Sequence, residues 1–593
     1  MIIKNILGVG FGGSMHNSGA TLIKDGEILT SIEEERISRV KEDGSFPSKA
    51  IQFCLESNGI KPEEIDLVVL GWENKRQHKD YLNLLLAGDI FSKYTAVNKL
   101  GYLCFQKITM NRYLDKLKSQ FPNAAVETVS HHQAHAYSTY YASPFDDSLV
   151  VTWDGRGEYE SATAYNVKNG KFDLLKRQVM PESLGFIYLA VTQFIGFDFG
   201  DEYKVMGLAS YGEPIYLDKF REIIKLDDET MYKIEPGYLQ HWLFHKKCPQ
   251  EGPFFGEKFV ALFGEPAPKG VEPSKREVDI AASLQARLNE VCSSIVQSLV
   301  HETGIKKLCL AGGVALNGVA NHYVLKNSGI EDIFIQPASG DGGISLGAAY
   351  WGYHHYFGCK TKIPFDHAYK GATFTNEQIN AELAPYNLNS YRLKKKAKTI
   401  ATLLNEGKVI GLFQGTGEIG PRALGSRSIL ADPRPSEHKE LVNSKIKFRE
   451  GFRPFAPSIL ADYACDYLDI EGPSEYMLLI AEVKEQYRDY LGAVTHINNT
   501  ARPQTVEKDV NPEYYSIISV FYELTGCPAV LNTSFNVKGE PVVHTPTDAI
   551  RCFFSTGLDY LVVGDLLFSK NKDFSEIQAI EGESHKHEEY SLA

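Results

Sequence analysis

Three absences limit what this protein can be. No apolar run reaches membrane-spanning length, and the N-terminal MIIKNILGVGFGG turns glycine-rich too soon for a signal peptide. The nine cysteines form no CxxC pair and are not densely spaced, so we expect reduced thiols in the cytoplasm. Excess positive charge is also missing: the formal net charge of -13 argues against a general nucleic-acid or anionic-membrane surface.

The length of the chain predicts more than one domain. A chain of 593 residues exceeds one ordinary core, and its 43% of hydrophobic residues is normal for a globular protein. The segment GCKTKIPFDHAYKGATF contains Pro and Gly and shows no clear period, which is typical of a boundary. We therefore expect one domain over residues 1–362 and another over residues 363–593.

An internal duplication is predicted in the first domain. Residues 5–33 and 148–177 each read as strand, Gly-rich turn and hairpin, with Asp25-Gly26 and Asn169-Gly170 as the hairpin turns. This α/β plan is that of the actin, hexokinase and Hsp70-like ATPase fold, which holds nucleotide phosphates between two related halves. The alternative is that two unrelated hairpins have similar sequence patterns.

A metal site is predicted from two histidines and two aspartates. In a helical HHQAHAYSTYYA, His131 and His135 lie one turn apart on one face. An HxxxH pair alone is more often a surface or core pair. Here the run SLVVTW leads to Asp154, and PASGDGG supplies a second Gly-flanked carboxylate, Asp341. The neighbouring glycine turns let a phosphate approach the backbone, and they contain Gly155, Gly312, Gly313 and Asn317.

The second domain contains a dense group of cations on Gly/Pro loops. These cations favour a site for a doubly charged phosphate, because guanidinium groups neutralise it and bind its oxygens in pairs. A solvated charge run is the alternative, which the flanking apolar residues weaken. The cations are Arg422, Arg427, Lys447, Arg449 and Arg453, and the polar residues His496, Arg502, Asn532 and Ser534 follow on later loops.

Taken together, the motifs resemble the O-carbamoyltransferases of antibiotic, toxin and nodulation-factor biosynthesis. In chain order they are HHQAHA, KVMGLASYG, LAGGVALN, SGDGG, GEIGPRALGSRSILADPR, KFREGFRPFAPS, THINNTARPQT and LNTSFNVKGEP, with EEERISR before them. The resemblance extends from residue 5 to about residue 570. It implies an actin-like domain, related to the enzymes that place threonylcarbamoyl on tRNA, followed by a YrdC-like α/β domain.

The resemblance also implies roles for individual residues. His131, His135, Asp154 and Asp341 match a metal site usually assigned to iron(II). The turns around Gly12, Gly155, Gly312 and Asn317 match an adenylate cradle. The implied catalytic residues are His16, Lys447 and Arg453, and the second-domain cations with His496, Arg502, Asn532 and Ser534 match the site for carbamoyl phosphate and ATP. Asn17 and Asn499 depart from the Asp and the Gly more usual at their positions.

The implied activity consists of two reactions. The second domain would form carbamoyladenylate from carbamoyl phosphate and Mg²⁺-bound ATP, and the first would transfer the carbamoyl group to a hydroxyl of a small metabolite, releasing AMP. The expected partners include a second copy of the chain in a homodimer, but neither nucleic acid nor a membrane. The alternatives are a tRNA-modifying enzyme, which the acidic chain disfavours, an actin-fold kinase, which leaves the Arg-rich domain without a role, and a non-enzymatic nucleotide-binding scaffold.

Overall fold

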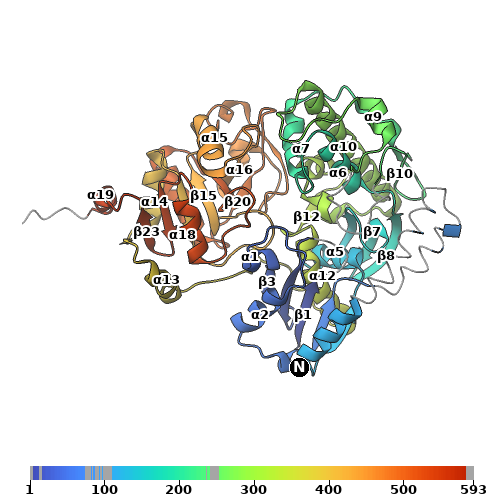
Figure 1. Cartoon of the computed structure of the whole chain (residues 1–593), viewed down its shortest axis with the longest axis horizontal. Coiled ribbons are helices and arrows are strands. Elements are labelled where there is room, and N and C mark those ends of the chain that lie inside the picture. The colour runs from blue at the N-terminus through green and yellow to red at the C-terminus, as the bar shows by residue number, and fades with distance from the viewer. Residues whose placement is uncertain are drawn as a thin grey trace, which may run out of the picture. The chain divides into compact units, whose positions relative to one another are not determined.

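The chain forms two compact units in the computed structural model (Figure 1). Unit 1 comprises Met1–Gly371 with the short segments Ile419–Pro421 and Leu478–Ile480, and unit 2 comprises Ala372–Glu418, Arg422–Met477 and Ala481–Ala593. The structure describes residues 4–11, 16–73, 110–235, 237–240 and 253–582, together with positions 82, 85, 86, 93 and 97. Among these residues, no helix is both long and apolar enough to cross a membrane.

Two five-stranded sheets with the same plan form the framework of unit 1. The first has the order β3-β2-β1-β4-β5, with an antiparallel meander of β1 to β3 and with β4 and β5 parallel to β1. The second, β12-β11-β6-β7-β8, repeats this order and these directions. The strands are β1 Asn5–Gly10, β2 Gly19–Lys24, β3 Glu27–Glu33, β4 Leu67–Leu70, β5 Ala125–Thr128, β6 Asp147–Trp153, β7 Glu160–Lys168, β8 Lys171–Val179, β11 Lys307–Ala311 and β12 Asp332–Ile335. The predicted duplication and the actin-like fold class are confirmed.

The two hairpin turns predicted from sequence explain the repeated meander. Asp25 and Gly26 have φ values of 51° and 92°, and Asn169 and Gly170 have 49° and 76°. Left-handed conformations at both central positions match the twist of antiparallel strands, and Asp, Asn and Gly adopt them at the lowest cost.

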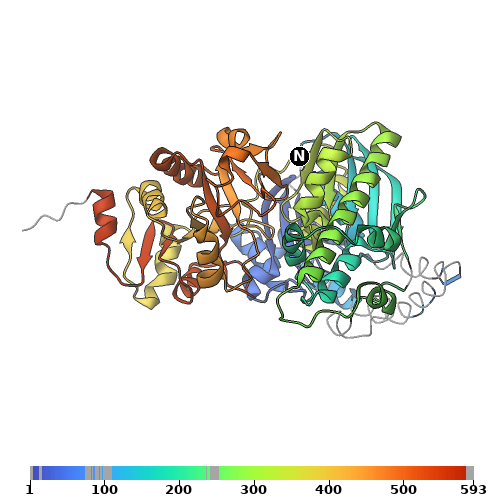
Figure 2. The same cartoon turned by 90° about the horizontal axis from the view of Figure 1, so that it is seen from above.

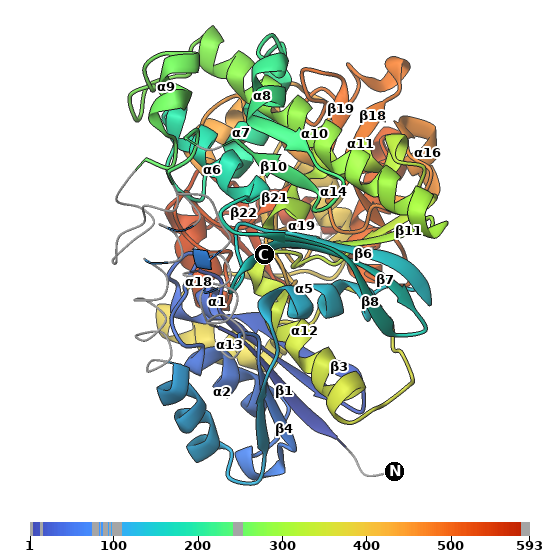
Figure 3. The same ribbon diagram turned by 90° about the vertical axis from the view of Figure 1, so that its right-hand side faces the viewer.

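Helices α5 (His131–Tyr140) and α12 (Ile344–Trp351) lie between the two sheets of unit 1 (Figure 3). Helix α12 packs on β1 and β2, α5 packs on β6 and β11, and the two helices contact each other. A Cβ on Gly347 of α12 would lie 1.8 Å from the carbonyl oxygen of Ala134 in α5, so only glycine permits this close crossing. The crossing brings the start of α5 next to the turn that precedes α12.

Helix α10 (Lys275–Thr303) is the long amphipathic helix expected from sequence, and Figure 2 shows it beside its neighbours in unit 1. Ser274 and Glu277 form a capping box at its start, and Gly304 ends it in a left-handed conformation. The other named helices of unit 1 are α1 Glu34–Ser38, α2 Ser48–Ser57, α6 Leu184–Phe194, α7 Glu202–Leu208, α8 Leu217–Ile223, α9 Glu257–Phe263 and α11 Gly318–Asn327, and a small hairpin is formed by β9 Ile224–Leu226 and β10 Tyr232–Ile234.

Unit 2 is built on an eight-stranded mixed sheet of order β13-β23-β22-β14-β15-β21-β16-β20, accompanied by a three-stranded sheet, β17-β18-β19. Buried apolar side chains of the large sheet and its helices form one core. The strands are β13 Tyr391–Arg392, β14 Ile410–Phe413, β15 Arg427–Ala431, β16 Ala456–Leu460, β17 Leu468–Asp469, β18 Ala481–Val483, β19 Thr500–Ala501, β20 Gln504–Val506, β21 Ala529–Ser534, β22 Tyr560–Val563 and β23 Leu566–Ser569. The helices are α13 Asn376–Leu383, α14 Lys396–Asn405, α15 Glu437–Val442, α16 Ala461–Tyr467, α17 Pro512–Thr525, α18 Pro546–Phe554 and α19 Ser575–Glu581.

Candidate active site

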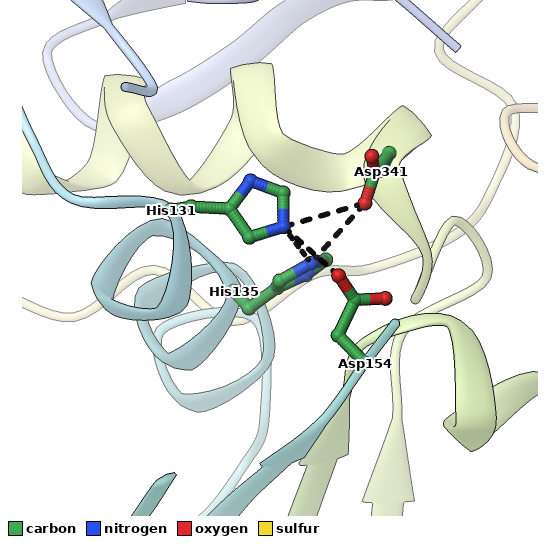
Figure 4. Close-up of side chains that lie close together, drawn as sticks. All are labelled: His131, His135, Asp154 and Asp341. Carbon is green, nitrogen blue, oxygen red and sulfur yellow. Dashed lines mark hydrogen bonds and ion pairs between the residues drawn. The ribbon is translucent and has the colours of Figure 1, made fainter. Parts of the chain in front are cut away.

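Four buried side chains converge in unit 1: His131 and His135 from the start of α5, Asp154 just after β6, and Asp341 just before α12 (Figure 4). One ligand atom from each lies within 4.8 Å of the others. The Nε2 atom of His131 is 3.1 Å from that of His135 and 3.1 Å from Asp154 Oδ2. Asp341 Oδ1 lies 3.5 Å from both Nε2 atoms. The four residues predicted as metal ligands therefore lie together.

The strand ends and glycine turns of the second sheet hold the aspartate side of this cluster. Gly312 has φ 93°, and a Cβ there would lie 2.1 Å from the carbonyl oxygen of Trp153. This close approach brings the next residue, Gly313, to Asp154, and its backbone N–H donates to Asp154 Oδ1 at 2.9 Å. Asp154 is thus oriented by the neighbouring strand turn, with Oδ2 directed at His131.

The donor set fits a divalent metal ion. Two imidazole nitrogens and two carboxylates form a mixed N/O set that suits such ions, and two Nε2 atoms 3.1 Å apart cannot both carry a proton without repulsion. Among the described residues, neither histidine Nδ1 has a hydrogen-bond partner. Burial disfavours charge, but Asp341 and Asp154 more than offset it and raise the pKa of His131 to about 9. Burial likewise opposes ionisation of Asp154, yet the two histidines hold its pKa below its usual value. The negative charge therefore attracts a cation.

Two residues beside the cluster are not identified by the sequence patterns. Glu158 accepts the backbone N–H of His131 with both oxygens at 3.0 Å, and burial raises its pKa to about 7. Its carboxyl group therefore fixes the first turn of α5. His132, although adjacent to a predicted ligand, bonds to Thr152 Oγ1 and to the carbonyl oxygen of Glu160. Burial, with the charge of His131, lowers the pKa of His132 to about 3, so it is a neutral structural residue.

The residues predicted to form a nucleotide cradle mostly have structural partners. The Asn317 side chain caps α11 by accepting the N–H of Ala320 at 3.0 Å, and its amide donates to Gln285 at 2.9 Å. Gly155 lies against Phe186, and the Gly313 N–H is directed at Asp154 as described. Gly12 lies outside the described residues. Their contact with a nucleotide stays a prediction.

His16, predicted as a catalytic residue, lies at the edge of the His/Asp cluster. Its Nδ1 atom is 3.9 Å from Asp341 Oδ2 and 3.0 Å from Asn17 Oδ1. Burial lowers the pKa of His16, but Asp341 and the hydrogen bond to Asn17 outweigh burial and raise it. The imidazole therefore lies next to the His/Asp cluster without belonging to it.

A group of cations in unit 2 lies close enough for its members to repel one another. Burial and the neighbouring Arg453 lower the pKa of Arg422 to about 10. The pKa of Arg502 is well below its usual value because of burial and because of Arg422, Arg449 and Arg453. The His496 imidazole is held neutral by burial and by Arg502, with a pKa of about 3. Binding of an anion relieves this repulsion and therefore lowers the free energy of the group.

Three of the predicted phosphate-site residues have protein partners instead. The buried Arg427 guanidinium donates to the carbonyl oxygens of Gln414, Gly415, Ser426 and Ala372, and it stacks on Phe413 at 3.7 Å. The Asn532 amide donates to Ala423, Ser458 and Gln504. The Lys447 ammonium lies within 2.6 to 3.2 Å of four oxygens of Ser534 and Asn536. In this structure the three residues hold loops together, and their role as substrate ligands stays a prediction.

Two further residues shape these loops and were not predictable as site residues. The Glu418 carboxylate accepts the backbone N–H groups of Leu424, Ser426 and Arg427 at 2.8, 2.7 and 3.2 Å. Asn443 accepts the Arg449 Nε–H at 2.7 Å and donates to the Arg453 carbonyl oxygen at 3.3 Å. Glu418 stands within the glycine-containing sequence GEIGP, whereas nothing around Asn443 in the sequence marks its role.

Comparison with known proteins identifies the class and the family. Residues 5–350 match the family model described as the carbamoyltransferase N-terminus, and residues 401–570 match the carbamoyltransferase C-terminus. The protein is therefore an enzyme that transfers a one-carbon group. It belongs to the carbamoyltransferase family.

Three relatives show how much of the chain the family likeness covers. Uncharacterized protein sll1178 of Synechocystis sp. is 36% identical over 95% of this chain and 96% of its own length. Nodulation protein NolNO of Sinorhizobium fredii is 34% identical over 94% of this chain and 79% of its own. Nodulation protein NolO of Bradyrhizobium diazoefficiens is 37% identical over 76% and 81%. The family resemblance inferred from the motifs is thus confirmed, because both family models match this chain and these relatives are similar to it over most of its length.

Proposed function

We propose that the protein is an ATP-dependent O-carbamoyltransferase that works through carbamoyladenylate. Carbamoyl phosphate would first be hydrolysed to carbamate and phosphate. A carbamate oxygen would then attack the α-phosphorus of ATP and release pyrophosphate. Finally, the hydroxyl oxygen of a small metabolite would attack the carbamoyl carbon, and AMP would leave. Adenylation supplies the leaving group that carbamate itself lacks.

The observation that carries this proposal is the mutually repelling cation group of unit 2. Burial and Arg453 lower the pKa of Arg422, and burial together with Arg422, Arg449 and Arg453 lowers that of Arg502, while Arg453 also forms an ion pair with Glu450 at 3.7 Å. Such a group is preorganised for the triphosphate of Mg²⁺-bound ATP and for carbamoyl phosphate. We assign this unit a YrdC-like role, with the boundary between the two functional parts near residue 362.

The His/Asp cluster of unit 1 would serve the transfer step. His131, His135, Asp154 and Asp341 would hold a divalent ion, by resemblance iron(II), which as a Lewis acid would polarise phosphate or carbonyl oxygens. His16, whose Nδ1 atom is 3.9 Å from Asp341 Oδ2, would take the hydroxyl proton. The names of the two nodulation proteins are in line with an acceptor from a specialised biosynthetic pathway.

The first test measures pyrophosphate release from Mg²⁺-bound ATP with and without carbamoyl phosphate. We expect release that depends on carbamoyl phosphate, and a loss of at least about a hundredfold in Arg453→Ala, because one cation facing a phosphate contributes a few kcal/mol. Arg392→Gln is the matched control, since that arginine is exposed on β13. Release without carbamoyl phosphate, or full activity in Arg453→Ala, would contradict the proposal.

A further inference from the structure

Asn17 connects a buried carboxylate to His16. Its side-chain amide nitrogen donates to Glu33 Oε2 at 2.9 Å, and its Oδ1 lies 3.0 Å from His16 Nδ1. Glu33 is the last residue of β3 and is 8% exposed. The three side chains form one chain of hydrogen bonds that ends beside Asp341.

When Glu33 is ionised, this chain of hydrogen bonds has one consistent arrangement of protons. An ionised carboxylate only accepts hydrogen bonds, so the NH₂ group of Asn17 must face Glu33 and its oxygen must face His16. Because that oxygen also only accepts, Nδ1 of His16 must carry the proton. The lone pair of the neutral imidazole is then on Nε2.

The backbone around the chain is fixed at several points. Asn17 has φ 54°, a left-handed conformation that Asn adopts more readily than most residues. Ser18 donates its backbone N–H to Asp43 at 2.9 Å and accepts the backbone N–H of Glu34 at 2.8 Å. A Cβ on Gly342 would lie 2.8 Å from the Glu33 carboxyl carbon, so the turn that carries Asp341 packs directly on Glu33. The orientation of Asn17 is therefore built into the fold.

We propose that Glu33 and Asn17 are positioning residues that hold His16 in the Nδ1–H form, with Nε2 free to accept the proton of the acceptor hydroxyl. As the O–H proton moves to Nε2, the hydroxyl oxygen bonds to the carbamoyl carbon, the bond from that carbon to the adenylate oxygen breaks, and AMP leaves. The inference rests on the proposed function because it assigns His16 as the base of the transfer step.

The first experiment reads the tautomer without any reaction. Histidine is labelled with ¹⁵N, and the His16 signals are assigned by their loss in His16→Gln. The spectra are recorded at pH 8, above the pKa of about 7 that burial gives Glu33. We expect a protonated Nδ1 and an unprotonated Nε2. A His16 with its proton on Nε2 overturns the inference, whether or not the protein forms carbamoyladenylate.

The second experiment removes the acceptor beside His16 and then restores it. Asn17→Gly removes the oxygen that faces Nδ1 and keeps a residue that tolerates the left-handed backbone at this position. The double variant Asn17→Asp/Glu33→Gln exchanges the amide and the acid, so that an oxygen again faces His16 and an amide again lies beside it. With methanol as the hydroxyl probe, AMP and methyl carbamate are measured. We expect kcat to fall about a hundredfold in Asn17→Gly, the size of a general-base contribution, and to stay within about tenfold of the unaltered protein in the double variant.

Two controls separate this inference from the proposed function. Pyrophosphate release and bound metal should stay at the level of the unaltered protein in all variants, because neither Asn17 nor Glu33 belongs to the cation group or the His/Asp cluster. If the unaltered protein releases no pyrophosphate, the proposed function fails while the tautomer measurement still decides the inference. A double variant no more active than Asn17→Gly overturns the positioning role.

Discussion

Replacing Lys447 with methionine should destabilise unit 2, because this ammonium acts as a structural crosslink. It is 4% exposed and has the carbonyl oxygens of Ser534 and Asn536 at 2.6 and 3.0 Å, together with Asn536 Oδ1 at 2.6 Å and Ser534 Oγ at 3.2 Å. An ammonium has three protons, and four protein oxygens already compete for them. No proton is left for a phosphate unless one of these contacts breaks.

The expected loss of stability follows from the hydrogen bonds to a charged donor that the substitution removes. Two backbone carbonyls and an amide oxygen lose a charged donor, and each such hydrogen bond contributes about 1.5–3 kcal/mol. The Ser534 carbonyl oxygen keeps the backbone N–H of Asn536 at 3.1 Å, and Asn536 Oδ1 keeps the Ser534 hydroxyl at 2.7 Å. Part of this cost is offset, because burial and the charges of Arg449 and Arg453 lower the pKa of Lys447 well below its usual value, so a charged lysine is itself unfavourable there. We therefore expect a net loss of about 3 kcal/mol in the free energy of unfolding of unit 2.

The assay compares Lys447→Met with Arg502→Met, a variant of the cation group. Urea unfolding followed by circular dichroism gives stability, and pyrophosphate release gives activity. Arg502 is repelled by Arg422, Arg449 and Arg453, so its removal should leave stability equal or higher while pyrophosphate release falls at least about a hundredfold. If Lys447→Met unfolds at the same urea concentration as the unaltered protein yet releases no pyrophosphate, Lys447 is a phosphate ligand and the crosslink reasoning is wrong.

Three further predictions concern unit 1. His135→Ala should lose bound metal by elemental analysis, whereas the matched control His132→Gln should keep it, because His132 bonds to Thr152 and not to the cluster; equal metal content in both would refute the site. Asp341→Asn should still release pyrophosphate with carbamoyl phosphate but form no methyl carbamate from methanol, and loss of both activities in a folded variant would show one shared site. Burial raises the pKa of Glu182 from 4.5 to about 7, so its ionisation opposes folding, and the stability present below pH 4.5 is lost as pH rises through 7. Because Glu182 is partly exposed, the loss is at most about 3 kcal/mol. In Glu182→Gln the urea concentration at the midpoint of unfolding should depend less on pH between pH 5 and 8. The same pH dependence in the variant and in the unaltered protein would contradict the raised pKa.

Local signals explain why the duplication was predictable from sequence. The Asp25-Gly26 and Asn169-Gly170 turns are set by residues adjacent in the chain, and each fixes the register of a hairpin. The later parallel strands could not be placed in this way. The segment Leu67–Leu70 pairs with β1 across about sixty residues of chain, and nothing in its four apolar residues specifies that partner.

The same distinction separates the predicted site residues from the missed ones. His131 and His135 are recognised by helical spacing, and Asp154 by its place after an apolar strand. Glu158 and Glu33 act through contacts with other elements. In the sequence they cannot be told apart from the many glutamates that lie on the surface. The departures at Asn17 and Asn499 also become clear only in three dimensions: their φ values are 54° and 62°, and Asn tolerates this region better than most residues.

The cations of unit 2 show the limit of reading chemistry from composition. Arg427 and Lys447 lie within the same Gly/Pro loops as Arg422 and Arg453, and the sequence gives all four the same character. Arg427 and Lys447 each have several protein oxygens within hydrogen-bond distance. Burial and a neighbouring arginine lower the pKa of Lys447 as they do that of Arg422, so repulsion alone does not separate the two kinds of cation. Because a carbonyl is present at every residue, its position near a cation depends only on the fold. A basic motif therefore predicts where an anion site is, and the backbone around each cation decides whether that cation binds the ligand or holds the loop that does.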